Sequence, residues 1–217
     1  RENCEGEYSN IGGRIYEGTE AEMAMQQSLF TRRGVDRVLR YAFDLARSRP
    51  RKRLTSATKS NGIIHTMPYW DERVKAIAKE YPEVGVDAYH IDILAAHFVR
   101  FPERFDVVVG SNLFGDILSD LGPATTGTIA IAPGGNINPE KEFPSMFEPV
   151  HGSAPDIAGK GIANPCAAIL SLEMVMRWSL GRTDAADRIF KAVDAAINAG
   201  ARTADLGGKL RTRPMGD

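Results

Sequence analysis

The sequence predicts an α/β protein, because stretches with helical and with strand periodicity alternate along most of it. Apolar residues recur at helical spacing over residues 32–49, and Pro50 then ends the pattern. Residues 105–109, Phe-Asp-Val-Val-Val, are apolar and β-branched, which is typical of a buried parallel strand. Strands and helices that alternate at these lengths favour a sheet covered by helices.

The other elements follow in order. The glycine-rich residues 8–22 predict short strands joined by turns, and Thr31 can cap the helix of residues 32–49. A stretch rich in Gly, Pro, Ala and Ser, residues 125–164, has few helical patterns. We expect strands at 53–59 and 84–90, and helices from Pro68 to near Pro82, at 91–100, at 165–180 and at 183–199.

Composition excludes several classes of protein. The 217 residues include 27 basic and 28 acidic side chains, a net charge of −1, so no overall field would attract nucleic acid or an anionic membrane. No apolar run is long enough to span a bilayer. Cys4 and Cys166 have no metal-type spacing and suggest no disulfide framework, so we expect a reducing cytoplasm.

The composition changes after Pro123, and we place a domain boundary near Thr126. The chain opens on Arg1 without a Met, in a dense run of charged residues and glycine. Nothing there resembles a helix start or a disordered tail, so we expect the sequence to be part of a longer protein.

Two carboxylates four residues apart, Asp116 and Asp120, are the first candidate site. In residues 112–120, NLFGDILSD, helical spacing would direct both from one face. Like charges placed this way repel unless each is well solvated or a cation lies between them, and Mg²⁺ prefers such oxygens. A solvated acidic surface is the ordinary alternative. The pair follows a predicted strand, however, and open α/β sheets bind ligands at that end.

Other candidates follow other strands or lie in the opening segment. A lone Asp at a helix start is usually a cap, but Asp92 adds a third carboxylate at successive strand ends. Most lysines are solvated, yet Lys59 beside a metal could lose its proton and act as a base. Tyr8 could serve packing or donate a proton, and Arg1 offers a planar fork suited to a carboxylate.

Residues 148–165, EPVHGSAPDIAGKGIANP, form a second dense segment. Its glycines and small residues would let the backbone approach a ligand closely, and His151 lies among two carboxylates and an amide. The segment does not match the dinucleotide-binding pattern G-x-G-x-x-G, so spacing alone leaves its purpose open.

Three motifs in this order resemble the isocitrate/isopropylmalate dehydrogenase family: RENCEGEY at residues 1–8, NLFGDILSD at 112–120, and residues 148–165. The likeness runs from residue 1 to the DLGG turn at 205–208, and it implies an isopropylmalate dehydrogenase-like α/β fold. FTRRGVDR (30–37), TSATKSNG (55–62) and MPYWDERV (67–74) are most similar to the tartrate/D-malate dehydrogenase branch. Isopropylmalate and isocitrate relatives usually carry DKAN or HKAN at residues 58–61.

The resemblance implies a role for each candidate. Asp92, Asp116 and Asp120 would hold Mg²⁺ or Mn²⁺, and Arg1 would bind a substrate carboxylate. Lys59 would help remove the hydroxyl proton during hydride transfer to NAD, and Tyr8 would protonate the enolate left after CO₂ is lost. The implied activity is NAD-dependent oxidative decarboxylation of a small 2-hydroxy dicarboxylic acid, D-malate or tartrate.

The resemblance also implies that the cofactor lies against residues 151–164. Asp156 and Ile157 occupy the position that separates NAD from NADP, and an acidic side chain there would repel a 2′-phosphate, which favours NAD. The expected cofactor contacts are Glu148, His151, Gly152, Ser153, Ala154, Asp156, Ile157 and Asn164.

By the same resemblance, residues 1–126 would form a small domain for substrate, metal and dimerisation, and residues 127–217 the C-terminal half of the large NAD-binding domain. Lys59 and Asp92 would act in the neighbouring subunit's site, so a homodimer is implied. Family members carry a longer N-terminal part, and we therefore expect this chain alone to be inactive.

Two alternatives remain. Within the same class, the protein could be the 3-isopropylmalate dehydrogenase of leucine biosynthesis. In another class, it could be a non-catalytic regulatory or dimerising subunit. Such a subunit would have no need to keep all six of the candidate catalytic, substrate and metal residues, and the sequence has all six.

Overall fold

The computed structural model describes residues 1–217 and divides into two compact units, Arg1–Leu118 (unit 1) and Ser119–Asp217 (unit 2). The division falls inside helix α4 (Asn112–Thr125), which runs without interruption through both. The predicted domain boundary near Thr126 lies at the end of this helix.

Unit 1 is built on a parallel sheet of three strands in the order β4-β3-β5. The central strand β3 is buried from Leu54 to Thr58, and its Ser56 pairs with Ala88 on one side and Val109 on the other. Because the strands are parallel, the residues that follow them lie at one edge of the sheet. The strands are β3 (Arg53–Thr58), β4 (Gly85–His90) and β5 (Val107–Val109).

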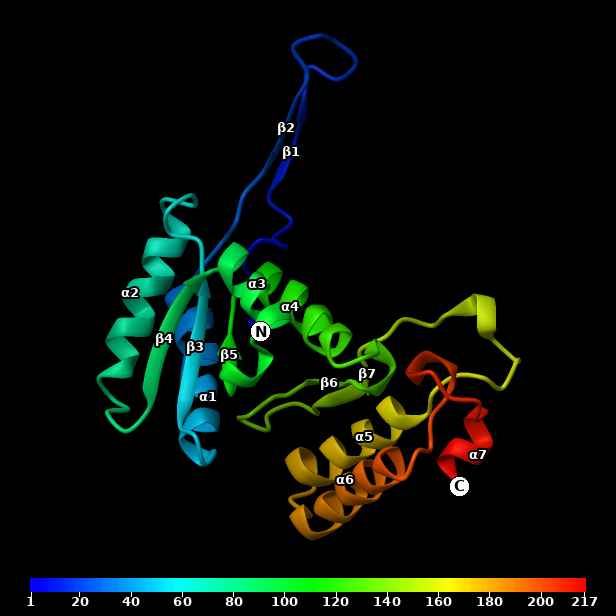
Figure 1. The fold of residues 1–217 in the computed structure, drawn as a ribbon. Helices are drawn as coiled ribbons and strands as arrows, with labels where there is room; N and C mark the ends of the chain where they lie inside the picture. The colour runs from blue at the N-terminus through cyan, green and yellow to red at the C-terminus, as the bar shows by residue number, and fades with distance from the viewer. The chain divides into compact units, whose positions relative to one another are not determined.

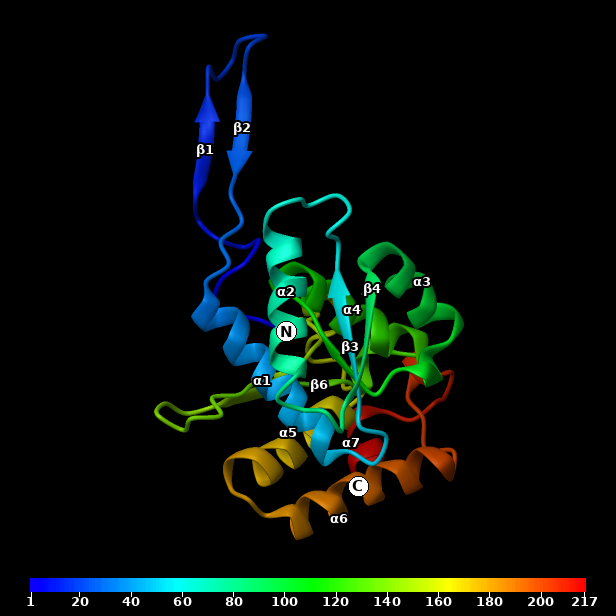
Figure 2. The same ribbon diagram turned by 90° about the vertical axis from the view of Figure 1, so that its left-hand side faces the viewer.

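Three helices besides α4 complete this part of unit 1. Thr31 caps the first, as predicted, by accepting a hydrogen bond from the backbone N–H of Gly34. Trp70 is fully buried, and its indole N–H donates to Ser56 Oγ at 2.9 Å. Figure 2 shows α2 and α3 on either side of strands β3 and β4. The three helices are α1 (Arg32–Ser48), α2 (Thr66–Ala78) and α3 (Ile91–Arg100).

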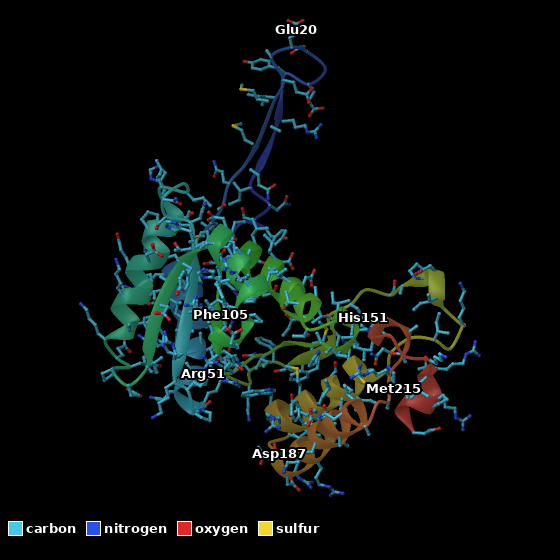
Figure 3. All side chains as sticks on the ribbon, viewed as in Figure 1. Glu20, Arg51, Phe105, His151, Asp187 and Met215 are labelled. Atoms are coloured by element: carbon cyan, nitrogen blue, oxygen red, sulfur yellow. The ribbon has the colours of Figure 1, made fainter.

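An antiparallel hairpin, β1 (Gly12–Ile15) with β2 (Met23–Gln26), extends away from the rest of unit 1 (Figure 1). Every residue of both strands is exposed. Glu20 lies at its tip (Figure 3). Strands were predicted within residues 8–22, and β1 confirms this, but the second strand begins one residue beyond that range.

Unit 2 contains a second antiparallel hairpin and a pair of helices. Helix α5 packs against both strands of the hairpin and runs beside α6 (Figure 1). The hairpin and the last helix were not predicted. The elements are β6 (Pro133–Asn136), β7 (Met146–Pro149), α5 (Cys166–Met174), a π-helical turn (Val175–Ser179), α6 (Thr183–Asn198) and α7 (Thr212–Gly216).

The helix predicted from Pro68 to near Pro82 has other bounds in the structure. Helix α2 begins before Pro68, which fits in a first turn because no helical N–H bond is needed there, and it ends at Ala78. Short 3₁₀ helices join the elements: Pro102–Arg104, Ile129–Ile131, Pro155–Ile157 and Ala204–Leu206. Arg51 stabilises the first of these connections, because its guanidinium donates hydrogen bonds to the backbone carbonyls of residues 103–105. Figure 3 labels Arg51 and Phe105. No helix is both long and apolar enough to cross a membrane.

Candidate active site

The first turn of helix α4 holds Arg1. Asn112 Oδ1 accepts hydrogen bonds from Arg1 Nε at 3.0 Å and from Nη2 at 2.8 Å. Nη1 forms an ion pair with the carboxylate of Asp116, one turn further along the helix. The side chain of Arg1 keeps 33% of its surface exposed, so the guanidinium is fixed on one side and open to solvent on the other.

Tyr8 reaches the same carboxylate from the opening segment. Its hydroxyl donates to Asp116 Oδ2 at 2.8 Å, while the guanidinium of Arg1 lies 5.8 Å from its ring centroid. The hydrogen bond to Asp116 is the main reason that the pKa of the Tyr8 hydroxyl lies above its usual value.

Two glutamates, Glu2 and Glu7, which sequence reasoning missed, shape this opening segment. The carboxylate of Glu2 is buried and accepts from the backbone N–H groups of Cys4 and Glu5. Glu7 accepts from Ser111 Oγ at 2.6 Å and from the N–H of Leu113 at 3.0 Å, which satisfies a donor at the start of α4. Their sequence signal is weak, because the partners of Glu7 lie more than 100 residues away.

Lys59 and Asp92 form a second cluster in unit 1. Lys59 follows β3 and Asp92 lies in the first turn of α3, and Lys59 Nζ lies 2.6 Å from Asp92 Oδ1. The hydrogen bond from Lys59 is the largest cause that lowers the pKa of the Asp92 carboxyl below its usual value. The two residues that were predicted to act together across a subunit boundary are thus neighbours within one chain.

The three predicted metal carboxylates do not gather within a single chain. No group of three or more His, Cys, Asp or Glu side chains could hold a metal ion. Asp116 contacts Arg1 and Tyr8, Asp92 contacts Lys59, and Asp120 is exposed on α4. The prediction that Asp92 serves the neighbouring subunit's site does not require all three to meet in one chain.

In unit 2, the predicted cofactor residues line an exposed loop that follows β7. Ala154 adopts a left-handed backbone conformation, with φ of 43°, directly before the 3₁₀ helix that contains Asp156 and Ile157. His151 Nδ1 lies 2.8 Å from the carbonyl oxygen of Gly152. Gly152, Ser153, Asp156 and, on β7, Glu148 are exposed; His151, Ala154 and Ile157 are half-buried.

Asn164 differs from the other predicted cofactor residues because its side chain is buried and engaged. Its Oδ1 accepts from the N–H of Cys166 at the start of α5, and its Nδ2 donates to Asp205 at 3.0 Å. Asn164 therefore satisfies the first backbone N–H of α5, from the position before the N-cap Pro165, and ties this helix to the turn that contains Asp205.

Comparison with known sequences defines the family. A sequence profile of the isocitrate/isopropylmalate dehydrogenase family matches residues 1–217. The chain therefore belongs to that family, as its motifs predicted. It is 62% identical to the D-malate dehydrogenase (decarboxylating) of Escherichia coli K12 and 60% identical to the tartrate dehydrogenase/decarboxylase of Pseudomonas putida. Both alignments cover 100% of this chain but only 61% and 60% of the relatives.

Solved structures agree. The isocitrate dehydrogenase of Methylococcus capsulatus superposes with a TM-score of 0.88 at 41% identity, over 97% of this chain and 62% of that one. A β-decarboxylating dehydrogenase of Thermococcus kodakarensis gives 0.83 at 40% identity, over 99% and 60%. The predicted α/β fold and the likeness to the tartrate/D-malate branch are both confirmed.

Proposed function

We propose that the protein is an NAD-dependent β-decarboxylating dehydrogenase of a small 2-hydroxy dicarboxylic acid, D-malate or tartrate, that uses Mg²⁺ or Mn²⁺. The observation that carries this proposal is the convergence of the Arg1 guanidinium and the Tyr8 hydroxyl on the Asp116 carboxylate. A cation for a substrate carboxylate, a proton donor and a metal-type oxygen ligand thus occupy one small region. The relatives named for D-malate and tartrate support the substrate class.

The carboxylates fit a hard divalent cation, because Mg²⁺ and Mn²⁺ take oxygen ligands. Asp116 and Asp120 are one helical turn apart on α4, and Asp92 keeps 66% of its side chain exposed. When bound, the cation would supply Lewis-acid stabilisation of negative charge on the substrate's oxygens. The other cation of this region is the guanidinium of Arg1, which is positively charged because it is protonated, whereas a metal ion is charged without a proton.

Each of the chain's own residues then has a defined task. Arg1 would bind a substrate carboxylate through its planar fork. Lys59 would accept the proton of the substrate hydroxyl. The Tyr8 hydroxyl, which already donates a hydrogen bond, would deliver a proton to the carbon from which CO₂ has departed.

The loop of residues 151–164 fits a dinucleotide in its chemistry. Asp156 lies exposed in a 3₁₀ helix, where its carboxylate could accept hydrogen bonds from ribose hydroxyls and would repel a 2′-phosphate. NAD, when bound there, would supply the hydride acceptor. In this proposal, the loop would hold the cofactor through the ribose that Asp156 meets.

We also propose that the active form is a homodimer in which Lys59 and Asp92 complete the partner's site. The arm, which is the β1–β2 hairpin with its connecting turn, supports this proposal. It exposes apolar side chains to solvent, and a partner subunit would cover them. Helices α3 and α4 add Ile93, Val99 and Ile117 to the exposed apolar surface of unit 1. The exposed apolar side chains of the arm are Ile15, Tyr16, Met23 and Met25.

Substrate choice can be tested on the full-length protein with NAD and Mn²⁺. We expect formation of NADH and CO₂ from D-malate or tartrate, and much slower turnover of 3-isopropylmalate and isocitrate. Strong turnover of 3-isopropylmalate alone would assign the protein to leucine biosynthesis instead. Absence of turnover with all four acids, in a folded dimer that binds NAD, would favour a regulatory subunit.

Shared sites can be tested by mixing two inactive variants, Lys59→Met and Tyr8→Phe. After subunit exchange, random pairing makes half of the dimers hybrid, and each hybrid has one intact site, so about a quarter of the activity should return. If Lys59 and Tyr8 act within the same subunit, no activity returns, and the proposed arrangement is wrong.

A further inference from the structure

We propose that Asn112 is a positioning residue for Arg1, which sets the direction in which the guanidinium meets the substrate's carboxylate, and that Gly115 provides the space in which Arg1 lies. The inference rests on the proposed function and deepens it, since it names residues that control how the acid is held. It begins from the contacts of the first turn of α4.

The amide of Asn112 is itself held in one orientation. Only 5% of the residue is exposed, and its Nδ2 donates to the backbone carbonyl of Glu5 at 2.9 Å. Because that bond fixes the amide nitrogen, the oxygen Oδ1 must face Arg1. The opening segment and α4 are also in close contact here, since a Cβ built on Gly6 would lie 3.2 Å from the Cβ of Asn112.

Asn112 occupies one particular edge of the guanidinium. Its oxygen accepts from both Nε and Nη2, which are the two donors on the side edge of the arginine fork. The end edge is formed by Nη1 and Nη2. Each of these nitrogens has two N–H groups, and the contacts to Asp116 and Asn112 use one on each, so one on each is left for a bidentate carboxylate. A carboxylate ligand is therefore directed to the end of the fork, and it meets Arg1 in one geometry rather than two.

Gly115 allows this arrangement by lacking a side chain. A Cβ at this position would lie 2.6 Å from Arg1 Cβ and 2.7 Å from Cγ, and both are closer than real carbon atoms approach. Its nearest neighbours include the backbone of Arg1, so the clash cannot be relieved by a rotation at the far end of a side chain. Any side chain at residue 115 must therefore displace Arg1 from Asn112.

The test uses the full-length protein and the variant Asn112→Ala. We expect the KM for the hydroxyacid to rise about tenfold, as for a lost hydrogen bond to a charged group, with a smaller change in kcat and with the KM for NAD unchanged. Ser111→Ala is the matched control, because Ser111 is fully buried beside Asn112 and bonds Glu7 without contact to Arg1. It should lower Tm while the KM for the acid stays within about twofold of the parent.

A double-mutant cycle with Arg1→Lys separates positioning from general stability. An ammonium group cannot make the paired contacts of the fork, so Asn112→Ala should add little to the KM defect of Arg1→Lys. Independent effects that multiply would mean that Asn112 acts through the fold alone, and would overturn the proposal. If Asn112→Ala fails to fold, Gly115→Ala provides the same cycle, because it keeps the amide and moves Arg1.

The outcomes also distinguish this inference from the proposed function. If the parent enzyme oxidises the hydroxyacid and the KM of Asn112→Ala equals that of the parent, the positioning role is wrong. The proposed function would still stand. If the parent oxidises no hydroxyacid, the proposed function fails, and calorimetric binding of malonate, an unreactive dicarboxylate, to the same variants tests the positioning role. Equal malonate affinity in the parent and in Asn112→Ala would then refute it.

Discussion

The residues around Arg1 and the loop of residues 151–164 are both proposed to bind a ligand, but they differ in how many side-chain contacts they make without one. Arg1 and Tyr8 already contact Asp116, and buried Asn112 holds the guanidinium of Arg1. In the loop, Gly152, Ser153 and Asp156 are exposed, and its glycines have empty space where a side chain would stand. The first region is ordered before any ligand arrives, whereas the second acquires most of its contacts only with one.

This difference has an energetic consequence. Side chains that are fixed in advance lose little further freedom on binding, so their contacts act mainly on orientation. Side chains of an exposed loop lose freedom when the ligand binds, and their substitution changes affinity more than stability. Variants in the two regions should therefore differ in which of kcat, KM and Tm they change.

The largest effect is expected outside both regions, at Lys59, because it is the proposed base. Lys59→Met should lower kcat by about 10²–10⁴-fold, the usual contribution of a positioned acid or base, in the full-length enzyme. Lys79→Met, an exposed lysine at the end of α2, is the control and should leave kcat unchanged. Steady-state assays of NADH formation measure both, and a kcat of Lys59→Met within tenfold of the parent would remove Lys59 from the mechanism.

Asp156 tests the loop side of the comparison. Asp156→Ala should raise the KM for NAD about tenfold, as for a lost hydrogen bond to a carboxylate, and should leave Tm unchanged because the side chain is exposed. Asp194→Ala, an exposed aspartate on α6, is the control. A fall in Tm specific to Asp156→Ala would mean that the loop is ordered by its own contacts, and the contrast with Arg1 would fail.

Local signals predicted most of unit 1 and less of unit 2. The helix of residues 91–100 was predicted to the residue, and the Thr31 cap was confirmed by its bond to Gly34. Strand β6 is Pro-Gly-Gly-Asn, which has neither β-branched residues nor alternation, so no sequence pattern marks it. Its residues pair with residues of β7 that lie 10 to 16 positions further along the chain, and only the folded chain reveals this pairing.

The site divides in the same way. Chemistry-bearing residues such as Lys59 and Asp116 could be proposed from residue type and position after a strand, and the roles that the motifs imply for them stay predictions. The contacts of Asn112 with Arg1 and of Glu7 with the start of α4 could not be predicted, because each joins residues more than 100 positions apart. Glycine at position 115 gave no signal either, since its reason is the proximity of Arg1.

Asn164 tests whether the cofactor loop contains any structural residue. Asn164→Ala removes the acceptor of the Cys166 N–H at the start of α5 and the bond to Asp205, so it should lower the free energy of unfolding by about 1–2 kcal/mol. Chemical denaturation measures this. Asn198→Ala, at the end of α6, serves as the control at an ordinary helix position. An unchanged unfolding midpoint with a raised KM for NAD would make Asn164 a cofactor residue alone.

The smallest effect concerns Asp205, the partner of Asn164. Burial acts to raise the pKa of its carboxyl, but hydrogen bonds from Thr203, Asn164 and Thr128 outweigh burial and hold the pKa below its usual value. A carboxyl whose pKa is lowered by folding stabilises the protein above its unfolded pKa, about 3.9, and loses that contribution as the pH falls further. Solvent screens this partly exposed group, so Asp205→Asn should cost at most about 1 kcal/mol at pH 7. The difference in Tm between Asp205→Asn and the parent should shrink below about pH 4. A difference that stays constant with pH would mean that the shape of Asp205, rather than its charge, stabilises the fold.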